Sequence, residues 1–239
     1  MAHISRKELK KDEIRETLEH GAEAVLSHQK ILGIVITVAV LVAVAVVGWR
    51  FYSERQTGKA SVAFADAIKI FQARIRTPGE AADPTEPTYL DEKNKFEDAL
   101  KKFDGVAHDY PRTRPGQTAL YYSALCQEHL GNYNQAAEAL QKMTSSSDDE
   151  FAALARFQLA SVEVHQGKTE DAVRLYRQLA AKPTIMVPKP LVLLSLGDAL
   201  AKSNPQEAIK IFSDLKKDFP ESGVSDEADK RLEALAPKT

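Results

Sequence analysis

The hydrophobic pattern divides the chain into one uninterrupted apolar run and a long stretch of amphipathic segments. Residues 31–49 form the apolar run, ILGIVITVAVLVAVAVVGW, which holds no charge and a single hydroxyl, on Thr37. At about 1.5 Å rise per residue, a helix of this length spans about the hydrocarbon core of a bilayer. A buried core helix is the alternative, but such a helix carries a polar stripe and this run has none. Because Trp49 and Tyr52 suit the headgroup level, we predict an uncleaved transmembrane anchor over residues 31–52.

The segment before the anchor is charged but balanced. Residues 1–30 hold 6 basic and 6 acidic side chains, with Ile14, Leu18 and Val25 at helical spacing. This pattern predicts an amphipathic helix. A helix that lies on a membrane would have a basic polar face, so the balanced charge favours a solvated helix that leads into the span. A docking helix for a membrane partner is the alternative.

Beyond Tyr52 the pattern changes to helical segments of about 12–20 residues, separated by Gly, Asn and Pro, without the alternation of a strand. Three stretches, which start at Gly131, Gly167 and Ser203, align without gaps at a period of 36 residues. Each carries a small residue and, four positions later, a large one, which lets a neighbouring helix approach closely. The pattern predicts an all-α domain over residues 53–239. Its predicted packing anchors are the small residues Ala99, Ala136, Ala172 and Ala208 and the large residues Phe103, Leu140, Tyr176 and Phe212.

An earlier copy precedes these stretches, because KFEDALKKFDGVAHDYP, which ends at Pro111, matches the segment that ends at Pro220. The apolar helix from Val62 to Ile75 would be its first helix, displaced by a proline-rich linker at residues 77–88. These assignments give about four helix pairs. A charged last helix, at about residues 224–235, supplies the polar outer face that a terminal cap needs.

Charge and motifs argue against catalysis and against nucleic acid as a partner. The chain has 32 Lys and Arg against 34 Asp and Glu, so no excess of positive charge attracts a phosphate backbone. The patterns HExxH, GxxxxGK[ST], GxGxxG and GxSxG do not occur in the sequence. SSSDDE, at residues 145–150, lacks the spacing of a calcium loop and predicts a capping box of Ser147 and Glu150. We expect Cys126 in the core, and a protein that is not an enzyme and takes no cofactor, metal or small-molecule substrate.

Tyr121, Phe157 and Leu193 share one 36-residue register, at a position on the first helix of each pair that tends to face a concave groove. Core packing is the alternative, and large apolar residues on helices more often pack. His129 and His165 also lie 36 residues apart, but they lack further ligands at matching spacing, which disfavours zinc. The candidate partner-binding residues are Tyr121, Leu125, His129, Phe157, His165 and Leu193. This register lacks the Lys and Asn pattern that clamps a C-terminal carboxylate.

A second proline-rich segment, KPTIMVPKP at residues 182–190, carries three apolar side chains in a row. Proline keeps this segment out of a helix. We expect Ile185, Met186 and Val187 to fold back on the helices, with a contact to a partner as the alternative.

The small and large anchors, the turn LGNY at residues 130–133 and a period in the mid-thirties resemble tetratricopeptide repeats. The period of 36 exceeds the usual 34. Ala124 and Ala160 hold the small position of the first helix, whereas Leu196 occupies it in the last copy. The repeats are therefore degenerate.

Residues 48–68, GWRFYSERQTGKASVAFADAI, extend the resemblance to the ancillary subunit of the bacterial Sec translocon, a family also linked to envelope cell-division coordinators. The resemblance implies a single-pass protein of the bacterial inner membrane, with a cytoplasmic N-terminus and a periplasmic repeat domain. The flanking charges, Arg50, Arg55 and Lys59 against Lys30, favour the opposite orientation. Because this rule is weak for large domains, we expect the topology that the resemblance implies.

The predicted function is binding. The leading hypothesis is a membrane-anchored interaction protein, an ancillary or chaperone-like subunit near the export translocon. Its expected partners are translocon subunits, envelope chaperones or translocating polypeptides. The alternative is an envelope scaffold that links the inner membrane to cell-division or outer-membrane assembly machinery.

Overall fold

The structure is a computed structural model that describes residues 29–81 and 85–236. The amphipathic helix predicted over residues 1–30 lies almost entirely outside these residues. The described chain falls into two compact units, the first ending at Arg55 and the second beginning at Gln56. Its elements are α2 (Gln29–Phe71), β1 (Arg74–Ile75), β2 (Thr88–Tyr89), α3 (Glu92–Asp109), α4 (Arg114–His129), α5 (Tyr133–Met143), α6 (Asp149–His165), α7 (Thr169–Ala181), α8 (Lys189–Leu200), α9 (Pro205–Asp218) and α10 (Ser225–Leu235).

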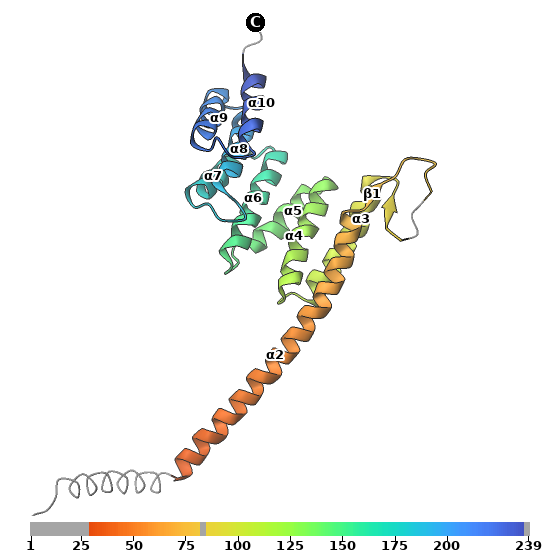
Figure 1. Ribbon diagram of the computed structural model, residues 1–239, viewed down its shortest axis with the longest axis vertical. Coiled ribbons are helices and arrows are strands. Elements are labelled where there is room, and N and C mark those ends of the chain that lie inside the picture. The colour runs from red at the N-terminus through yellow and green to blue at the C-terminus, as the bar shows by residue number, and fades with distance from the viewer. Residues whose placement is uncertain (1–28, 82–84, 237–239) are drawn as a thin grey trace, which may run out of the picture. The chain divides into compact units, whose positions relative to one another are not determined.

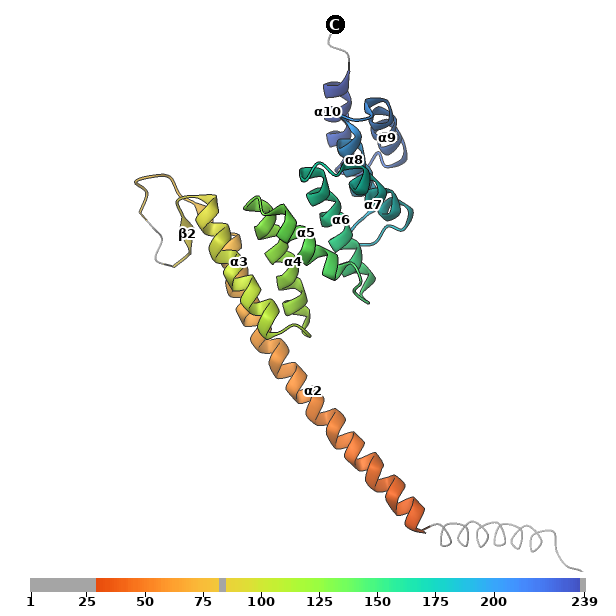
Figure 2. The same cartoon turned by 180° about the vertical axis from the view of Figure 1, so that it is seen from behind.

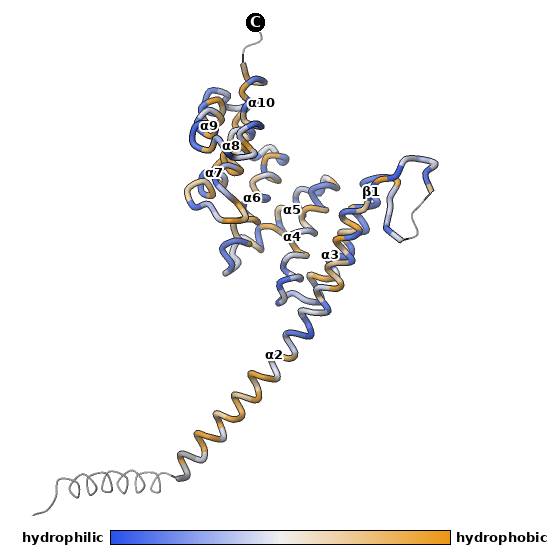
Figure 3. Tube along the Cα trace, in the orientation of Figure 1, coloured by the Kyte–Doolittle hydropathy of each residue, from blue (hydrophilic) through white to orange (hydrophobic). Residues whose placement is uncertain are grey.

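Helix α2 is a single helix of 43 residues that contains the predicted anchor and the first helix of the repeat domain. Its stretch from Gly33 to Phe71 is long and apolar enough to cross a membrane. The large apolar side chains of the anchor are exposed, as Trp49 at 63% illustrates, and Figure 3 shows this part of α2 as a continuous hydrophobic run. No proline interrupts the helix, and its three glycines, Gly33, Gly48 and Gly58, do not break it.

The second unit is a stack of antiparallel helices in which each helix packs against the next, from α3 through α10 (Figures 1 and 2). The predicted all-α solenoid is confirmed. Three clusters of buried residues form its core, one around each successive set of helices. The last helix, α10, packs against α9 and α8 at the C-terminal end.

Short turns join the two helices of each later pair. Gly131 and Gly167 adopt left-handed φ values of 75° and 76°, a conformation that favours glycine. Helix α6 begins differently from the prediction, because Asp148 and not Ser147 is its N-cap. The Asp148 side chain accepts the backbone N–H groups of Glu150 and Phe151, since the helix starts one residue later than a Ser147 cap requires.

The predicted packing anchors are all buried, none with more than 3% of its surface exposed. They are Ala99, Ala136, Ala172, Ala208, Phe103, Leu140, Tyr176 and Phe212. In the last pair, the small residue of the first helix is Gly197. It lies one position after Leu196, the residue that the 36-residue period puts at the small position. A Cβ at Gly197 would overlap the ring of Phe212, so the close approach of α8 and α9 depends on glycine.

The segment between α2 and α3 differs from the prediction. The helix ends at Phe71 and not at Ile75, which lies in β1 and pairs in parallel with Tyr89 of β2. Two-residue strands have no detectable period in the sequence, which explains why the pattern did not predict them.

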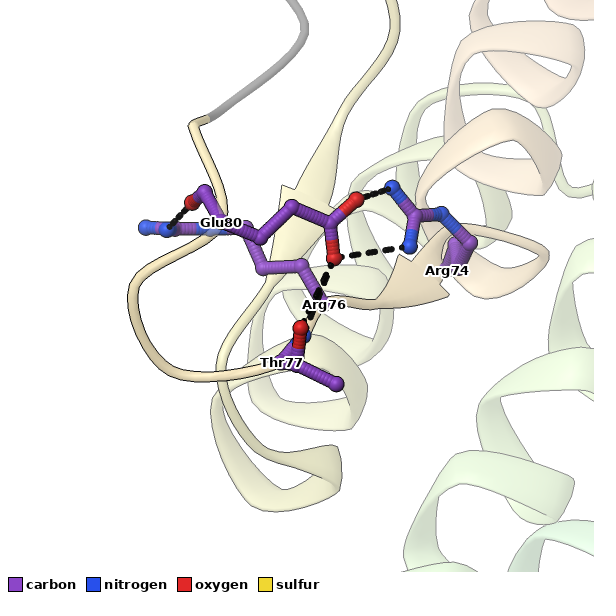
Figure 4. A network of polar contacts seen from close by, with 4 residues as sticks. All are labelled: Arg74, Arg76, Thr77 and Glu80. Carbon is purple, nitrogen blue, oxygen red and sulfur yellow. Dashed lines mark hydrogen bonds and ion pairs between the residues drawn. The ribbon is translucent and has the colours of Figure 1, made fainter.

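A polar network closes this segment (Figure 4). Arg74 donates to both carboxylate oxygens of Glu80, at 3.1 and 2.5 Å, and Thr77 donates its N–H at 3.1 Å and its hydroxyl at 3.2 Å. Arg76 donates to the Glu80 carbonyl at 2.6 Å. The hydrogen bonds from Arg74 are the main reason that the pKa of Glu80 falls to about 2.

Candidate interaction surface

The predicted recognition residues lie on α4, α6 and α8, the first helices of the three later pairs. Tyr121 of α4, Phe157 of α6 and Leu193 of α8 are each half-buried. Each packs against one of the core clusters with part of its side chain and leaves the rest accessible. We call these three residues the first-helix row. Part of each side chain packs and part meets solvent, and recognition of a partner by these residues stays a prediction.

Ring contacts fix the two aromatic members of the first-helix row. The Tyr121 ring lies edge-on to Tyr122 at 5.8 Å between centroids, and the Phe157 ring lies edge-on to Tyr176 at 5.7 Å. Such arrangements are the favoured geometry of aromatic pairs. Burial raises the pKa of Tyr121 to about 12, so its hydroxyl is neutral at physiological pH.

A largely buried carboxylate joins α4 to α6 next to this row. The Glu128 side chain is only 15% exposed. It accepts hydrogen bonds from the Gln158 amide and, at 3.3 Å, from the Ser161 hydroxyl, and the His165 Nε2 atom lies 3.6 Å away. Leu125 is half-buried and precedes Glu128 by one helical turn. We call Glu128, Gln158, Ser161 and His165 the Glu128 network.

The two histidines occupy equivalent positions and make equivalent contacts. His129 stacks on Phe96 of α3, with centroids 4.0 Å apart and planes at 5°. His165 stacks on Tyr133 of α5 at 5.3 Å and 8°. Each ring therefore ties a first helix to the second helix of the preceding pair. No group of three or more metal-ligating side chains is found within residues 29–81 and 85–236.

The arginines of α4 and α6 have partners of their own, whereas Lys189 of α8, one helical turn before Leu193, is exposed. Helices α4 and α6 carry one arginine each. Arg114 donates to Asp148 at 2.8 Å and lies 4.7 Å from the centroid of the Phe151 ring. Arg156 donates to the Thr144 carbonyl at 2.7 Å. Neither guanidinium is directed at the first-helix row.

The loop between α7 and α8 forms a second exposed apolar feature, and it corrects the expectation that its three apolar residues fold back. Val187 is fully buried, but Ile185 is 92% exposed and Met186 46% exposed. The Glu150 carboxylate accepts the backbone N–H groups of Ile185 and Met186 at 3.2 and 2.8 Å. These hydrogen bonds lower the pKa of Glu150, and the one from Met186 contributes most. They also hold Ile185 and Met186 at the outer end of the loop.

Sequence reasoning missed the Glu128 network and the role of Glu150. Both depend on pairs of residues from different helices, and Glu128 has the apolar Val164 as its equivalent 36 residues on. A search for residues that repeat cannot find such a contact. The only available signal was that the equivalent positions of Glu128 in the later repeats are the apolar Val164 and Leu200.

Comparison with known families supports this architecture. A family model described as a tetratricopeptide repeat-like domain matches residues 28–184, more than half of the 239-residue chain. A second model, described as a tetratricopeptide repeat, matches residues 157–222. No curated protein matches the chain.

Proposed function

Because the chain belongs to the tetratricopeptide repeat-like family, we propose that it binds proteins on the first-helix row and serves as an ancillary or chaperone-like subunit beside the protein-export translocon. A role in protein–protein interaction follows from the family, whose members are typically non-catalytic scaffolds. The translocon as the place of action is supported by the resemblance of residues 48–68 to the ancillary subunit of that channel.

The observation that carries the proposal is the half-exposed state of Tyr121, Phe157 and Leu193 on successive first helices. Side chains that were needed only for packing would be buried as fully as the anchors. Rigid aromatic side chains with accessible area are typical binding hot spots. Their repetition along the solenoid suits an extended polypeptide, which offers side chains at regular intervals.

The chemistry of the row favours apolar, uncharged segments as ligands. The nearby carboxylate of Glu128 is occupied by Gln158 and Ser161, and the arginines of α4 and α6 have partners of their own. A C-terminal carboxylate would therefore find neither of these two arginines free. Apolar segments of a polypeptide that has not yet folded fit these properties.

The membrane topology is part of the proposal. Helix α2 has the length and composition of a membrane span, and we propose that it anchors the chain in the bacterial inner membrane with the repeat domain in the periplasm. Protease added to spheroplasts tests the orientation, because a periplasmic domain is digested without lysis. A domain that stays protected until the membrane is lysed would show that the flanking charges predicted the orientation correctly.

Photo-crosslinking in intact membranes tests the binding surface. A crosslinking amino acid replaces Tyr121 or Phe157 of the full chain, and Gln178, an exposed position on α7, serves as the control. We expect crosslinks to translocating polypeptides or translocon subunits from the two row positions and not from Gln178. Equal labelling from all three positions would contradict the row as binding surface. Crosslinks only to cell-division or outer-membrane assembly proteins would favour the envelope scaffold.

A further inference from the structure

The two ends of the solenoid differ in how they meet solvent. At the C-terminal end, α10 carries a charged outer face, with ion pairs that include Lys230–Glu227 at 3.1 Å. At the N-terminal end, α4 covers only one side of the pair formed by α2 and α3. The ends of a repeat array need a polar surface or a partner, because an uncovered face exposes apolar atoms.

A groove runs between α2 and α3 on this terminal pair. Its volume is about 540 Å³, and every residue that lines it belongs to the second unit. The apolar lining comes from Ala63, Ile70, Gly105 and Val106. Val62, next to Ala63, is 67% exposed, more than any other large apolar side chain of α2 whose burial is described. An antiparallel helix pair with an apolar groove is half of a four-helix arrangement.

Charges of both signs flank the apolar lining. Asp66 of α2 and Asp98 and Asp109 of α3 line the groove together with Lys101 and Lys102 of α3. The Asp66 and Asp109 side chains are 61% and 65% exposed. A two-fold axis brings the same patch of two subunits together, so that a residue of one copy faces a different residue of the other. A surface that carries positive and negative charges can therefore complement a copy of itself.

We propose that a second copy of this chain occupies the groove, so that the α2–α3 pairs of two protomers associate around a two-fold axis. The lysines of one copy then face the aspartates of the other, and the apolar linings meet between them. Residues 1–30 of the same chain are a poor occupant, because the predicted anchor places them across the membrane from the groove. Anchoring in one bilayer also raises the effective concentration of one protomer near another.

A charge-swap experiment on the full chain in nanodiscs tests this pairing. Two chains with different affinity tags are made, one with Lys101→Glu and Lys102→Glu and the other with Asp66→Lys and Asp109→Lys. We expect each variant to associate with itself about tenfold more weakly than the unmodified chain, because like charges then face each other. Mixing the two variants should restore association. Lys210→Glu on α9, the repeat equivalent of Lys101, is the matched control and should change nothing.

A cysteine crosslink decides the matter independently of the charged variants. Gly105 lines the groove, and a Cβ there meets no other atom, so Gly105→Cys fits the fold. A bismaleimide should join two Gly105→Cys chains but not two Lys217→Cys chains. An unmodified chain that is monomeric in nanodiscs would overturn the proposal. The proposal would also be overturned if the charge swaps left self-association unchanged, or if mixing the two variants did not restore association. The absence of a crosslink between Gly105→Cys chains would overturn it too. None of these results depends on whether the first-helix row binds a client.

Discussion

The ring of Phe212 lies directly against Gly197, where the addition of a single Cβ would produce an overlap with three ring carbons. Phe212 is fully buried, and it fills the space that the missing side chain leaves between α8 and α9. Phe212 is the large anchor that the repeat pattern predicts for α9, and Gly197 is the small residue of the neighbouring helix that it packs against.

We expect Gly197→Ala to destabilise the repeat domain. Overpacking a filled core costs about 1–3 kcal/mol. Alanine recovers part of this cost, because it is a better helix former than glycine by about 1 kcal/mol. Urea unfolding of residues 53–239, followed by circular dichroism, measures the difference. Gly105→Ala is the control and should stabilise, since a Cβ there meets open space. Equal effects of the two substitutions on stability would show that the close approach of Phe212 to position 197 does not require glycine.

The sequence pattern predicted the anchors because every helix pair needs the same packing at the same positions. It missed Gly197, which lies one residue off the 36-residue register of Ala124 and Ala160. A gapless alignment placed Leu196 at the small position. The structure instead brings Gly197 against Phe212.

The candidate binding surface was predictable only where it repeats. Tyr121, Phe157 and Leu193 share a register, but the sequence could not separate packing from recognition, because half-burial depends on the angle between neighbouring helices. Glu128 and Glu150 escaped notice because each acts through partners about 30 or more residues away. Such contacts exist only once the helices are stacked.

Cys126 should be inert in the folded protein. Its side chain is fully buried, and burial raises the pKa of its thiol to about 12, so that almost no thiolate exists at neutral pH. We expect a maleimide to label Cys126 in the native chain at least about a hundredfold more slowly than in urea, since the thiolate is the reactive form. Labelling of the exposed Gly105→Cys variant provides the control for reagent activity. Complete labelling of native Cys126 within minutes would contradict its burial.

The ion pair of Arg74 and Glu80 should make the segment between β1 and β2 sensitive to acid. The pKa of Glu80 is lowered from 4.5 to about 2, so the carboxylate favours the closed segment above about pH 4.5 and loses this effect as the pH falls toward 2. We expect Glu80→Gln to open the segment already at neutral pH, because both hydrogen bonds from Arg74 lose their charged acceptor. Faster cleavage after Arg74 and Arg76 by trypsin measures this opening. Glu86→Gln, in the same segment, is the control, and an unchanged cleavage rate in Glu80→Gln would show that the ion pair does not hold the segment closed.

Glu128 should matter more to stability than an exposed glutamate on the neighbouring helix. Glu128→Ala leaves the amide of Gln158 and the hydroxyl of Ser161 without their acceptor between α4 and α6, where the original side chain is only 15% exposed. An unsatisfied buried polar group costs about 1–3 kcal/mol, so we expect a loss of that order in the free energy of unfolding.

Glu138→Ala is the matched control. Its ion pair with Lys142 spans one helical turn, with side chains 72% and 66% exposed, and exposed pairs of this kind contribute about 0.3–0.5 kcal/mol. Urea unfolding compares the two. Equal losses of unfolding free energy in the two variants would mean that solvent replaces Glu128 at no cost. If Glu128→Ala causes no loss in a chain that already carries Gln158→Leu, the unpaired amide of Gln158 is the cause of the loss.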